Sequence, residues 1–415
     1  MAEWTSTISR ACAGGGVAAM LAGQTFGGKP MDRRAFLAAG STAALLPALA
    51  AGATPPAGAT TPTPGLFTTV KFTTDGLSLS PHEYVAVLQE IAAADDFEAD
   101  DYSRGGALAA LEARFAAALG KPAAIWLPTG TLANQLALRT LAGADRRVLV
   151  QADSHLYCDS GDGATTLAGL NLVPLGAGPE GITLDEVAYA LSMAASGRVA
   201  VPVGAIAIES PIRRRDHAAV PFEQLQAITT LAREHGIRTH LDGSRLFTLP
   251  LHAGHGVREH AALFDTVYVS TWKHFNSASG AILAGETAVI SPLFHARRMY
   301  GGGLPAAWPL AAPAARHLDS FEADYADAWR RMDAIIAALA PHRAFAFRKF
   351  ERGTSRLFLR VDTPDPAAYA ARVRAHDIHF PRGVNGDGEF VLQVNPTLAR
   401  RPVEALVAVM VAALG

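Results

Sequence analysis

Short apolar runs alternate with longer amphipathic segments over most of the chain. Several of these runs are apolar without interruption, which is typical of strands buried on both faces of a sheet. The runs that we expect to be strands are 123–128, 147–152, 171–176, 204–210, 238–244, 266–271 and 280–285. In the segment 221–236, apolar residues from Phe222 to Leu231 recur at helical spacing, and Gly236 ends the pattern. This alternation predicts an α/β domain with a mostly parallel sheet.

The pattern changes in the last part of the chain. A mostly helical stretch, 304–339, is followed by strand-like runs and two shorter helical segments. This order is typical of a small α+β domain that follows a connecting helix. We therefore expect a large α/β domain over residues 65–305, and a connector helix with a small C-terminal α+β domain over residues 306–415.

The first 64 residues read as an N-terminal extension. Within 31–53, Arg33 and Arg34 precede an apolar stretch and then small residues, and a linker rich in Thr, Pro, Ala and Gly follows. This predicts a twin-arginine signal peptide and a periplasmic or secreted protein. If the signal is not used, or if the arginine pair is a chance feature of an Ala-rich tail, the protein is cytoplasmic. The apolar stretch is short for a membrane span, so we expect no stable membrane anchor.

Composition excludes some classes of protein. The 415 residues are 50% hydrophobic and 18% charged, with a net charge of −2, which indicates a globular protein and gives no reason to expect nucleic-acid binding. The chain has two cysteines, Cys12 and Cys158. A disulfide framework or a cysteine-rich metal site is therefore not expected, and we predict no metal site.

Three stretches carry candidate chemistry, and the first is "LPTGTLANQLALRTL" (127–141). A strand ends at Pro128, and Thr129-Gly130-Thr131 opens a helix. Free backbone amides and two hydroxyls at a helix N-terminus suit a phosphate group. The stretch is not a Walker loop, because no Gly-Lys-Ser/Thr follows. Thr129 could alternatively be a plain helix N-cap.

The second stretch is "THLDGSRLF" (239–247). Asp242 stands at the C-terminal end of a buried strand, where open α/β sheets bind their ligands. A carboxylate in that place needs a cationic partner or several hydrogen-bond donors. Arg245 could pair with Asp242 or bind an anion. An ordinary Asp-Gly turn is the alternative interpretation.

The third stretch is "VYVSTWKHFNSASGAILAG" (267–285), in which Lys273 lies between two strand-like runs. A lysine whose ammonium group is desolvated loses its proton more easily and can form an imine with a carbonyl. The phosphate cradle, the Asp242 carboxylate and this lysine together fit pyridoxal 5'-phosphate. The carboxylate would keep the pyridine nitrogen protonated, and the lysine would hold the aldehyde until substrate displaces it.

These stretches, with "SHLY" (154–157) and "ARRMYGGG" (296–303), resemble the low-specificity L-threonine aldolase and β-eliminating lyase family of fold-type I pyridoxal-phosphate enzymes. The similarity covers about residues 70–320 and is weak in the C-terminal part. It implies an aspartate aminotransferase-like large domain, a small amino-acid substrate, and a homodimer or homotetramer.

The resemblance also implies roles in cofactor binding. Lys273 would form the imine with pyridoxal phosphate, and Asp242 would pair with the pyridinium. His155 would stack on the ring and assist proton transfer, although a histidine there is alternatively a capping or core residue. The residues implied to bind the phosphate are Thr129, Gly130 and Thr131.

Near the substrate, the resemblance places Arg245 beside the carboxylate and Thr74 where the family has a serine. Arg298 precedes a triple glycine, in a stretch implied to reach the neighbouring subunit's cofactor; the glycines are alternatively a simple turn. We assign no role to His274, because its side chain points away from that of Lys273 if the segment is extended.

The chain departs from the family pattern in two places. Ile212 stands where a second active-site histidine is expected, and His217 lies too far along to replace it by simple alignment. Val391 stands where the family has an arginine that binds the substrate carboxylate. Valine cannot form a bidentate arginine clamp, so Arg382 or one of Arg213–Arg215 takes its place, or the substrate differs.

The leading hypothesis is a carbon–carbon lyase of the threonine-aldolase type, which cleaves a β-hydroxy-α-amino acid to glycine and an aldehyde. His155 or an ordered water would take the proton of the β-hydroxyl. One alternative is β-elimination from another amino acid, which yields an α-keto acid and ammonia. A second alternative is a non-catalytic exported binding protein that keeps the fold.

Overall fold

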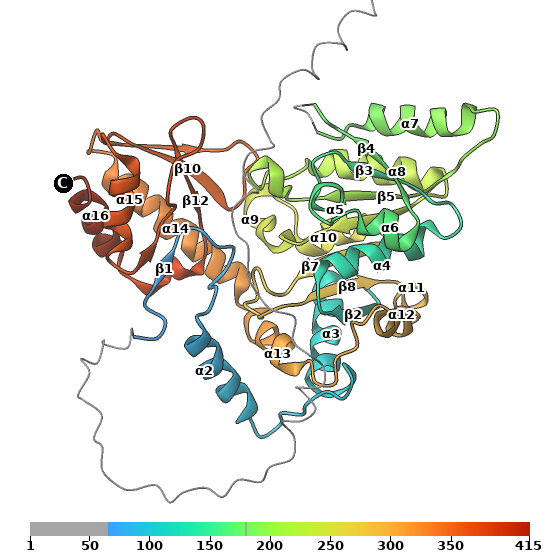
Figure 1. Cartoon of the computed structure of the whole chain (residues 1–415), viewed down its shortest axis with the longest axis horizontal. Coiled ribbons are helices and arrows are strands. Elements are labelled where there is room, and N and C mark those ends of the chain that lie inside the picture. The colour runs from blue at the N-terminus through green and yellow to red at the C-terminus, as the bar shows by residue number, and fades with distance from the viewer. Residues whose placement is uncertain (1–64, 179–180) are drawn as a thin grey trace, which may run out of the picture. The chain divides into compact units, whose positions relative to one another are not determined.

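The computed structural model describes residues 65–178 and 181–415 (Figure 1). These residues belong to one compact unit, Pro64–Gly415. The predicted signal peptide and linker lie outside the described residues, and the predicted boundary at residue 305 stays a prediction. No helix in the described ranges has the length and apolar composition needed to cross a membrane.

The centre of this unit is a seven-stranded sheet. In chain order its strands are β2 (Ala123–Leu127), β3 (Arg147–Gln151), β4 (Asn171–Leu175), β5 (Val203–Glu209), β6 (Arg238–Asp242), β7 (Thr266–Ser270) and β8 (Ala281–Gly285). In space the order is β2-β8-β7-β6-β5-β3-β4, with β8 antiparallel to both neighbours and the other neighbouring pairs parallel. The predicted α/β fold with a mostly parallel sheet is confirmed.

Helices cover both faces of the large sheet, as the strand residues themselves show. Ile206 and Ile208 of β5 belong to one hydrophobic cluster, whereas Ala205 and Ala207 belong to another. This alternation follows from the two-residue period of a strand. One face packs against α3 (Gly106–Leu119), α7 (Leu184–Ser196), α8 (Phe222–Glu234) and α10 (Val257–Ala262). The other packs against α4 (Gly130–Ala142), α6 (Gly163–Ala168) and α12 (Leu293–Met299).

The C-terminal part has its own antiparallel sheet, with the order β12-β10-β9. Its strands are β9 (Phe345–Lys349), β10 (Arg356–Val361) and β12 (Phe390–Gln393), and its helices are α15 (Pro366–Arg374) and α16 (Val403–Ala412). The helical stretch predicted as a connector consists of two helices, α13 (Trp308–His317) and α14 (Phe321–Leu339). The small C-terminal α+β arrangement is therefore as predicted. The predicted single connector helix is instead two helices, which are separated between His317 and Phe321.

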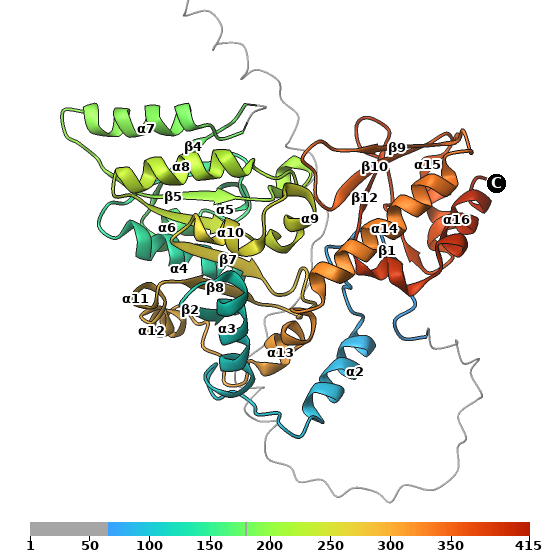
Figure 2. The same ribbon diagram turned by 180° about the vertical axis from the view of Figure 1, so that it is seen from behind.

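The first described strand lies with the last part of the chain. β1 (Val70–Lys71) pairs in parallel with β11 (Ile378–His379). The next helix, α2 (Pro81–Ala92), packs against α13. Figures 1 and 2 show the blue segment passing from β1, beside the C-terminal elements, to α2 and then to the large domain. Residues 72–80 therefore connect the β1–β11 pair to α2.

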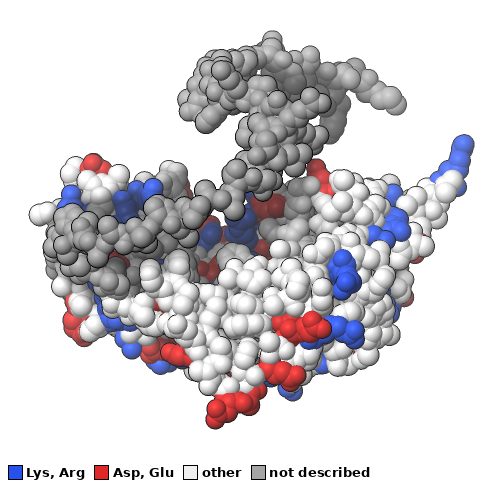
Figure 3. Space-filling model, turned by 60° about the horizontal axis from the view of Figure 1, so that its bottom comes forward, with Lys and Arg blue, Asp and Glu red and all other residues white. Residues whose placement is uncertain are grey.

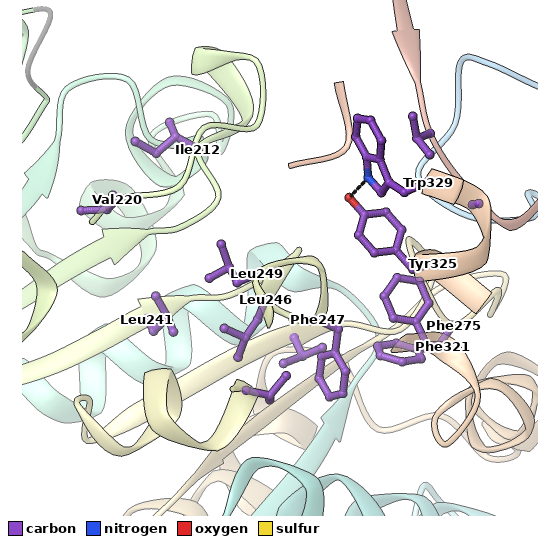
Figure 4. Packing of buried hydrophobic residues seen from close by; sticks show 14 of the residues in the cluster. Ile212, Val220, Leu241, Leu246, Phe247, Leu249, Phe275, Phe321, Tyr325 and Trp329 are labelled. Atoms are coloured by element: carbon purple, nitrogen blue, oxygen red, sulfur yellow. Dashed lines mark hydrogen bonds between the residues drawn. The ribbon is translucent and has the colours of Figure 1, made fainter. Parts of the chain in front are cut away.

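Aromatic side chains join α14 to the loop between β7 and β8 (Figure 4). Phe275 of the loop contacts Phe247 and Phe321, with ring centroids 4.9 and 5.5 Å apart. Phe321 stacks on Tyr325 at 5.6 Å, and Trp329 Nε1 donates to the Tyr325 hydroxyl at 3.0 Å. Buried aromatic pairs contribute about 0.5–1.5 kcal/mol each beyond their buried area. The loop that carries Lys273 is thus anchored by a connected aromatic cluster.

Candidate active site

Lys273 lies in the ten-residue connection between two antiparallel strands, β7 and β8. The connection closes on itself, because Thr271 N donates to Gly280 O at 3.1 Å and Ser277 N donates to Thr271 O at 3.2 Å. The segment at Lys273 is a turn, so the extended backbone that we considered for it is wrong. His274 is nevertheless directed into the core, where it stacks on Phe321 with ring centroids 4.7 Å apart.

The amine of Lys273 is electrostatically unusual. Among the described residues, no acceptor lies within hydrogen-bonding distance of its Nζ atom, and its side chain is half-buried. Burial, and then the nearby Arg245 charge, lower the pKa of Lys273 to about 8, although Asp75, Asp242 and Glu209 act in the opposite direction. A neutral amine is the nucleophilic form, so this lysine can react with a carbonyl near neutral pH.

Asp242 ends β6 and is held by neutral donors. Its Oδ2 accepts from Asn134 Nδ2 at 2.7 Å, and its Oδ1 accepts from the backbone N of Ser244 at 3.1 Å. The alternative in which Arg245 pairs with Asp242 is therefore wrong. A buried carboxylate with two donors keeps its position and can accept a further bond from a protonated ligand nitrogen.

Glu209 is a site residue that the sequence analysis missed. It ends β5, and its register partner on β6 is Asp242. Burial, and then the Asp242 charge, raise the pKa of Glu209. Its two oxygens accept from the backbone N of His155 at 2.6 Å and of Arg213 at 2.8 Å. A glutamate at the end of an otherwise apolar strand, level with Asp242, is the signal that could have identified it.

His155 begins the short helix α5 (His155–Cys158), directly after β3. Its Nδ1 lies 3.5 Å from Asp159 Oδ2, and its ring is half-buried. Asp159 also binds Arg213 and Arg214 at 2.9 and 2.5 Å, and the Arg214 hydrogen bond lowers the pKa of Asp159 to about 2. The imidazole therefore has an ionised carboxylate beside it at the same sheet edge as Asp242.

The predicted phosphate-binding residues lie at the start of α4. Thr129 is an N-cap, with its Oγ1 accepting from Leu132 N at 3.2 Å, so the alternative interpretation is confirmed, and phosphate binding stays a prediction. The first helical N–H groups, at Gly130 and Thr131, lack intrahelical acceptors. A Cβ on Gly130 would overlap the Tyr268 hydroxyl, so only glycine lets β7 approach the helix start. The N-cap role of Thr129 leaves the backbone N–H groups of Gly130 and Thr131 available to a phosphate, so the two interpretations are compatible.

Arg245 pairs with Asp75, a residue to which the sequence analysis gave no role. Arg245 Nε and Nη2 donate to the two Asp75 oxygens at 2.7 and 3.0 Å, and Gln393 Nε2 donates to Oδ1 at 2.5 Å. Burial alone would raise the pKa of Asp75, but the Arg245 charge brings it below its ordinary value. The pair is thus a bidentate, buried ion pair.

The segment with Asp75 reaches the Lys273 loop closely. A Cβ on Gly76 would overlap the carbonyl oxygen of Lys273, and Leu77 N donates to Asn276 Oδ1 at 2.8 Å. Thr74, Asp75 and Lys273 line a cavity of about 670 Å³. Figure 3 shows a hollow in which basic and acidic side chains are both visible. Thr74 lies beside this cavity, and its Oγ1 donates to Gly76 O at 2.9 Å.

Three other residues considered from the sequence lie elsewhere. Arg382 is exposed, and within the described ranges it has no hydrogen bond or ion pair, so the structure does not bring it to Lys273. Val391 is opposite Phe358 in the C-terminal sheet. Arg298 is exposed over the Tyr102 ring at 5.0 Å, and its reach to a neighbouring subunit stays a prediction.

The residues at this sheet edge fit pyridoxal phosphate. Lys273 offers an amine with a lowered pKa, Asp242 a carboxylate held by neutral donors, and α4 a helix start with free N–H groups. His155 adds an imidazole at the same edge. Within the described ranges, no three His, Cys, Asp or Glu residues are placed to hold a metal ion.

Comparisons with known proteins identify the family of this chain. The β-eliminating lyase family model matches residues 74–361, and the chain belongs to this family. It is 27% identical over 212 residues to a low-specificity L-threonine aldolase of Candida albicans, a match that covers 50% of this chain and 56% of that protein. It is 26% identical over 297 residues to the low specificity L-threonine aldolase of Escherichia coli, with 71% and 86% covered.

The match to the first of these relatives spans little more than half of that protein's length. Among solved structures, a candidate L-allo-threonine aldolase from Listeria monocytogenes superposes with a TM-score of 0.68 at 25% identity. That superposition covers 84% of this chain and 96% of the other. The predicted fold-type I architecture is confirmed.

Proposed function

We propose that the protein is a pyridoxal-phosphate-dependent lyase of the threonine-aldolase type. It cleaves the Cα–Cβ bond of a β-hydroxy-α-amino acid, so that the β-carbon leaves as an aldehyde and the α-carbon becomes that of glycine. The observation that carries the proposal is the placement of Lys273, with its lowered pKa, at the same sheet edge as Asp242. Family membership and similarity to threonine aldolases support it.

When bound, pyridoxal phosphate supplies an electron sink for the carbanion left at the α-carbon. Asp242 would hold the ring nitrogen, and Lys273 would hold the aldehyde end. Thr129, Gly130 and Thr131 would hold the phosphate through the start of α4. Asp242 ends a strand and Thr129–Thr131 begin a helix, which are rigid parts of the fold, and Lys273 lies in the loop that the aromatic cluster anchors.

His155 is our candidate for the group that removes the proton of the β-hydroxyl. Its Nδ1 lies 3.5 Å from Asp159 Oδ2, so the carboxylate can orient the ring and stabilise the imidazolium formed when Nε2 takes a proton. An ordered water is the alternative base. Replacing His155 with Asn should lower kcat about a hundredfold or more if the imidazole is the base, because general bases contribute at least this much.

The test begins with the purified protein and added pyridoxal phosphate. We expect the absorption band of lysine-bound cofactor, and its loss in Lys273→Ala. Lys349→Ala is the matched control, since Lys349 is exposed and paired with Asp333 at 2.6 Å. Absence of the band from the unmodified protein would rule out the cofactor. A panel of β-hydroxy-α-amino acids then tests cleavage, and failure of every member to release aldehyde excludes the aldolase reaction.

β-Elimination is the second candidate, and the family description favours it. It would release an α-keto acid and ammonia instead of an aldehyde and glycine, so product analysis separates the two reactions. A third outcome, the lysine-bound band without turnover of any amino acid, would support the non-catalytic binding protein. That reading is motivated by Ile212 and Val391, which replace expected site residues.

We also propose a homo-oligomer exported by the twin-arginine route. The resemblance to oligomeric enzymes supports the first part, and Arg33-Arg34 before an apolar stretch supports the second. Light scattering tests the oligomer, and a monomeric mass contradicts it. Cell fractionation of the protein and of its Arg33→Lys, Arg34→Lys variant tests export. Equal distribution of both proteins in the cytoplasm contradicts it.

A further inference from the structure

The last strand brings a glutamine, rather than an arginine, to the site. Gln393 of β12 donates to Asp75 Oδ1 at 2.5 Å, whereas Val391 is opposite Phe358. A glutamine amide carries no charge, so it cannot by itself balance a substrate carboxylate. If the protein acts on an amino acid, the cation that binds the carboxylate comes from another element.

An arginine stands directly opposite this glutamine. Arg356 of β10 is the register partner of Gln393 in the antiparallel pair of β10 and β12. Residues opposite each other in such a pair have Cβ atoms about 4.5–5.5 Å apart. The guanidinium of Arg356 can therefore reach the same space that an arginine at position 393 would reach. Its one ionic partner among the described residues is Asp216, at 3.1 Å.

Two buried nitrogen atoms in this region have no partner. Within the described residues, Arg245 Nη1 and His217 Nε2 are both buried without a hydrogen bond. The His217 side chain is fully buried, and that of Arg245 is 5% exposed. A buried polar atom without a partner costs about 1–3 kcal/mol. Such atoms beside Asp75, which lines the cavity with Lys273, point to a ligand that accepts their hydrogen bonds.

Two hydrogen bonds link the segment that carries His217 to the segment that carries Arg356. His217 Nδ1 lies 2.7 Å from Ser355 Oγ, and Ser355 directly precedes Arg356. Asp216, which directly precedes His217, binds Arg356. Although His217 was set aside because it lies too far along the sequence, the turn folds back, with His217 N donating to Ile212 O at 3.0 Å. The loop after β5 and the start of β10 therefore form one unit.

We propose that Arg356, His217 Nε2 and Arg245 Nη1 bind the α-carboxylate of the amino-acid substrate, in place of an arginine in the last strand. This inference rests on the proposed function. Arg245 is already neutralised by Asp75, so it contributes a hydrogen bond and Arg356 contributes the charge. The Asp216 side chain is 39% exposed, so it can turn to solvent when the substrate carboxylate takes its place on Arg356.

The state of His217 agrees with a donor role. Burial, and then the Arg245 charge, hold the pKa of His217 well below its ordinary value, so the ring is neutral. If the Ser355 hydroxyl donates to Nδ1, then Nε2 carries the proton and can donate to a carboxylate. His217→Phe should therefore weaken carboxylate binding without preventing the lysine-bound band from forming.

The test uses two ligands, glycine and methylamine, which differ by the carboxylate. The spectral change of the cofactor-loaded protein on titration gives the dissociation constant of each. The ratio of methylamine to glycine constants should fall about tenfold to a hundredfold in Arg356→Gln, in line with hydrogen bonds to charged groups. Arg360→Gln is the matched control. It lies on the same strand, is exposed, and among the described residues donates only to Asp387 O at 2.8 Å.

Asp216→Asn should act in the opposite direction. It frees Arg356, and asparagine tolerates the backbone φ of 50° at this position, so glycine should bind a few-fold more tightly. An unchanged ratio in Arg356→Gln, with the lysine-bound band intact, overturns the inference and leaves the proposed function standing. If the unmodified protein shows no band, the proposed function fails. In that case, calorimetric titration with glycine measures carboxylate binding without the cofactor signal. Equal dissociation constants of glycine for the unmodified and Arg356→Gln proteins overturn the inference.

Discussion

Asn134 and Asp242 are joined by a 2.7 Å hydrogen bond, and this bond continues into a buried chain. Asn134 Oδ1 lies 2.9 Å from His240 Nε2, and His240 Nδ1 lies 2.8 Å from Thr266 Oγ1. Burial lowers the pKa of His240 to about 4, so the ring is neutral and donates from only one nitrogen. Because an amide oxygen only accepts, Nε2 carries the proton, and the chain orients the Asn134 amide toward Asp242.

Replacing Asn134 with Leu should weaken cofactor binding. The substitution removes one donor from a buried carboxylate, a loss of about 1.5 kcal/mol or more, and the dissociation constant of pyridoxal phosphate should rise about tenfold. Titration of cofactor-free protein measures it. Thr140→Ala, an exposed change on the same helix, is the control. Equal constants for the two variants would show that Asn134 does not hold Asp242 for the cofactor.

The reaction of cofactor-free protein with pyridoxal phosphate should depend on pH through Lys273. The neutral amine reacts, and the pKa of Lys273 is lowered to about 8. The rate constant for appearance of the lysine-bound band should therefore rise about tenfold per pH unit below 8 and level off above it. Stopped-flow absorbance between pH 6 and pH 10 checks this expectation. A rate that keeps rising to pH 10 would mean that burial does not lower this pKa.

Gly76→Ala should damage the Lys273 loop. The added Cβ would overlap Lys273 O and would lie 2.7 Å from Asn276 Oδ1, so the backbone must shift. We expect a loss of about 1–3 kcal/mol in the free energy of unfolding and a slower formation of the lysine-bound band. Gly383→Ala is the matched control, because nothing lies within 4 Å of its Cβ position. Similar behaviour of both variants would contradict the close approach.

Removing Asp75 leaves the Arg245 charge buried without a partner. Asp75→Ala should lower the free energy of unfolding by about 3–5 kcal/mol, whereas removal of the exposed partner Glu90 of Arg316 should cost under about 1 kcal/mol. Urea unfolding measures both changes.

The Asp75 contribution should also have a defined pH dependence. The folded-state pKa of Asp75 is below its ordinary value of 3.8. Its stabilisation is therefore fully present above that value and is lost as the pH falls toward the folded-state pKa. The difference between Asp75→Ala and the unmodified protein should be constant from about pH 5 to pH 6.5, below the range in which Lys273, whose pKa Asp75 raises, titrates. A difference that changes strongly within this range would contradict the ion pair.

The sequence predicted the large sheet well because its strands are buried on both faces and read as unbroken apolar runs. It also indicated Asp242 and Lys273, since each directly follows or ends such a run. Asp75 and Gln393 gave no comparable signal. Their contacts join positions 170 and 318 residues apart, and no local period reports a contact over such a distance.

His217 was missed for a different physical reason. Alignment counts residues along the chain, whereas the turn after β5 returns the backbone so that position 217 lies beside position 212. Arg356 was missed because a strand-like run with an arginine at its start usually exposes that arginine. Only the pairing of β10 with β12 places it opposite Gln393, and the proposed role rests on that register.

The pairing of β1 with β11 has a consequence for the order in which the protein folds during synthesis. Thr69 Oγ1 donates to Asp377 Oδ1 at 2.8 Å, across 308 residues of sequence. This pairing cannot form until the whole intervening chain has left the ribosome, and by then the strands of the large sheet are already available. The segment with Thr74, Asp75 and Gly76 follows β1, so one end of the wall beside Lys273 is fixed only when the last part of the chain has been made.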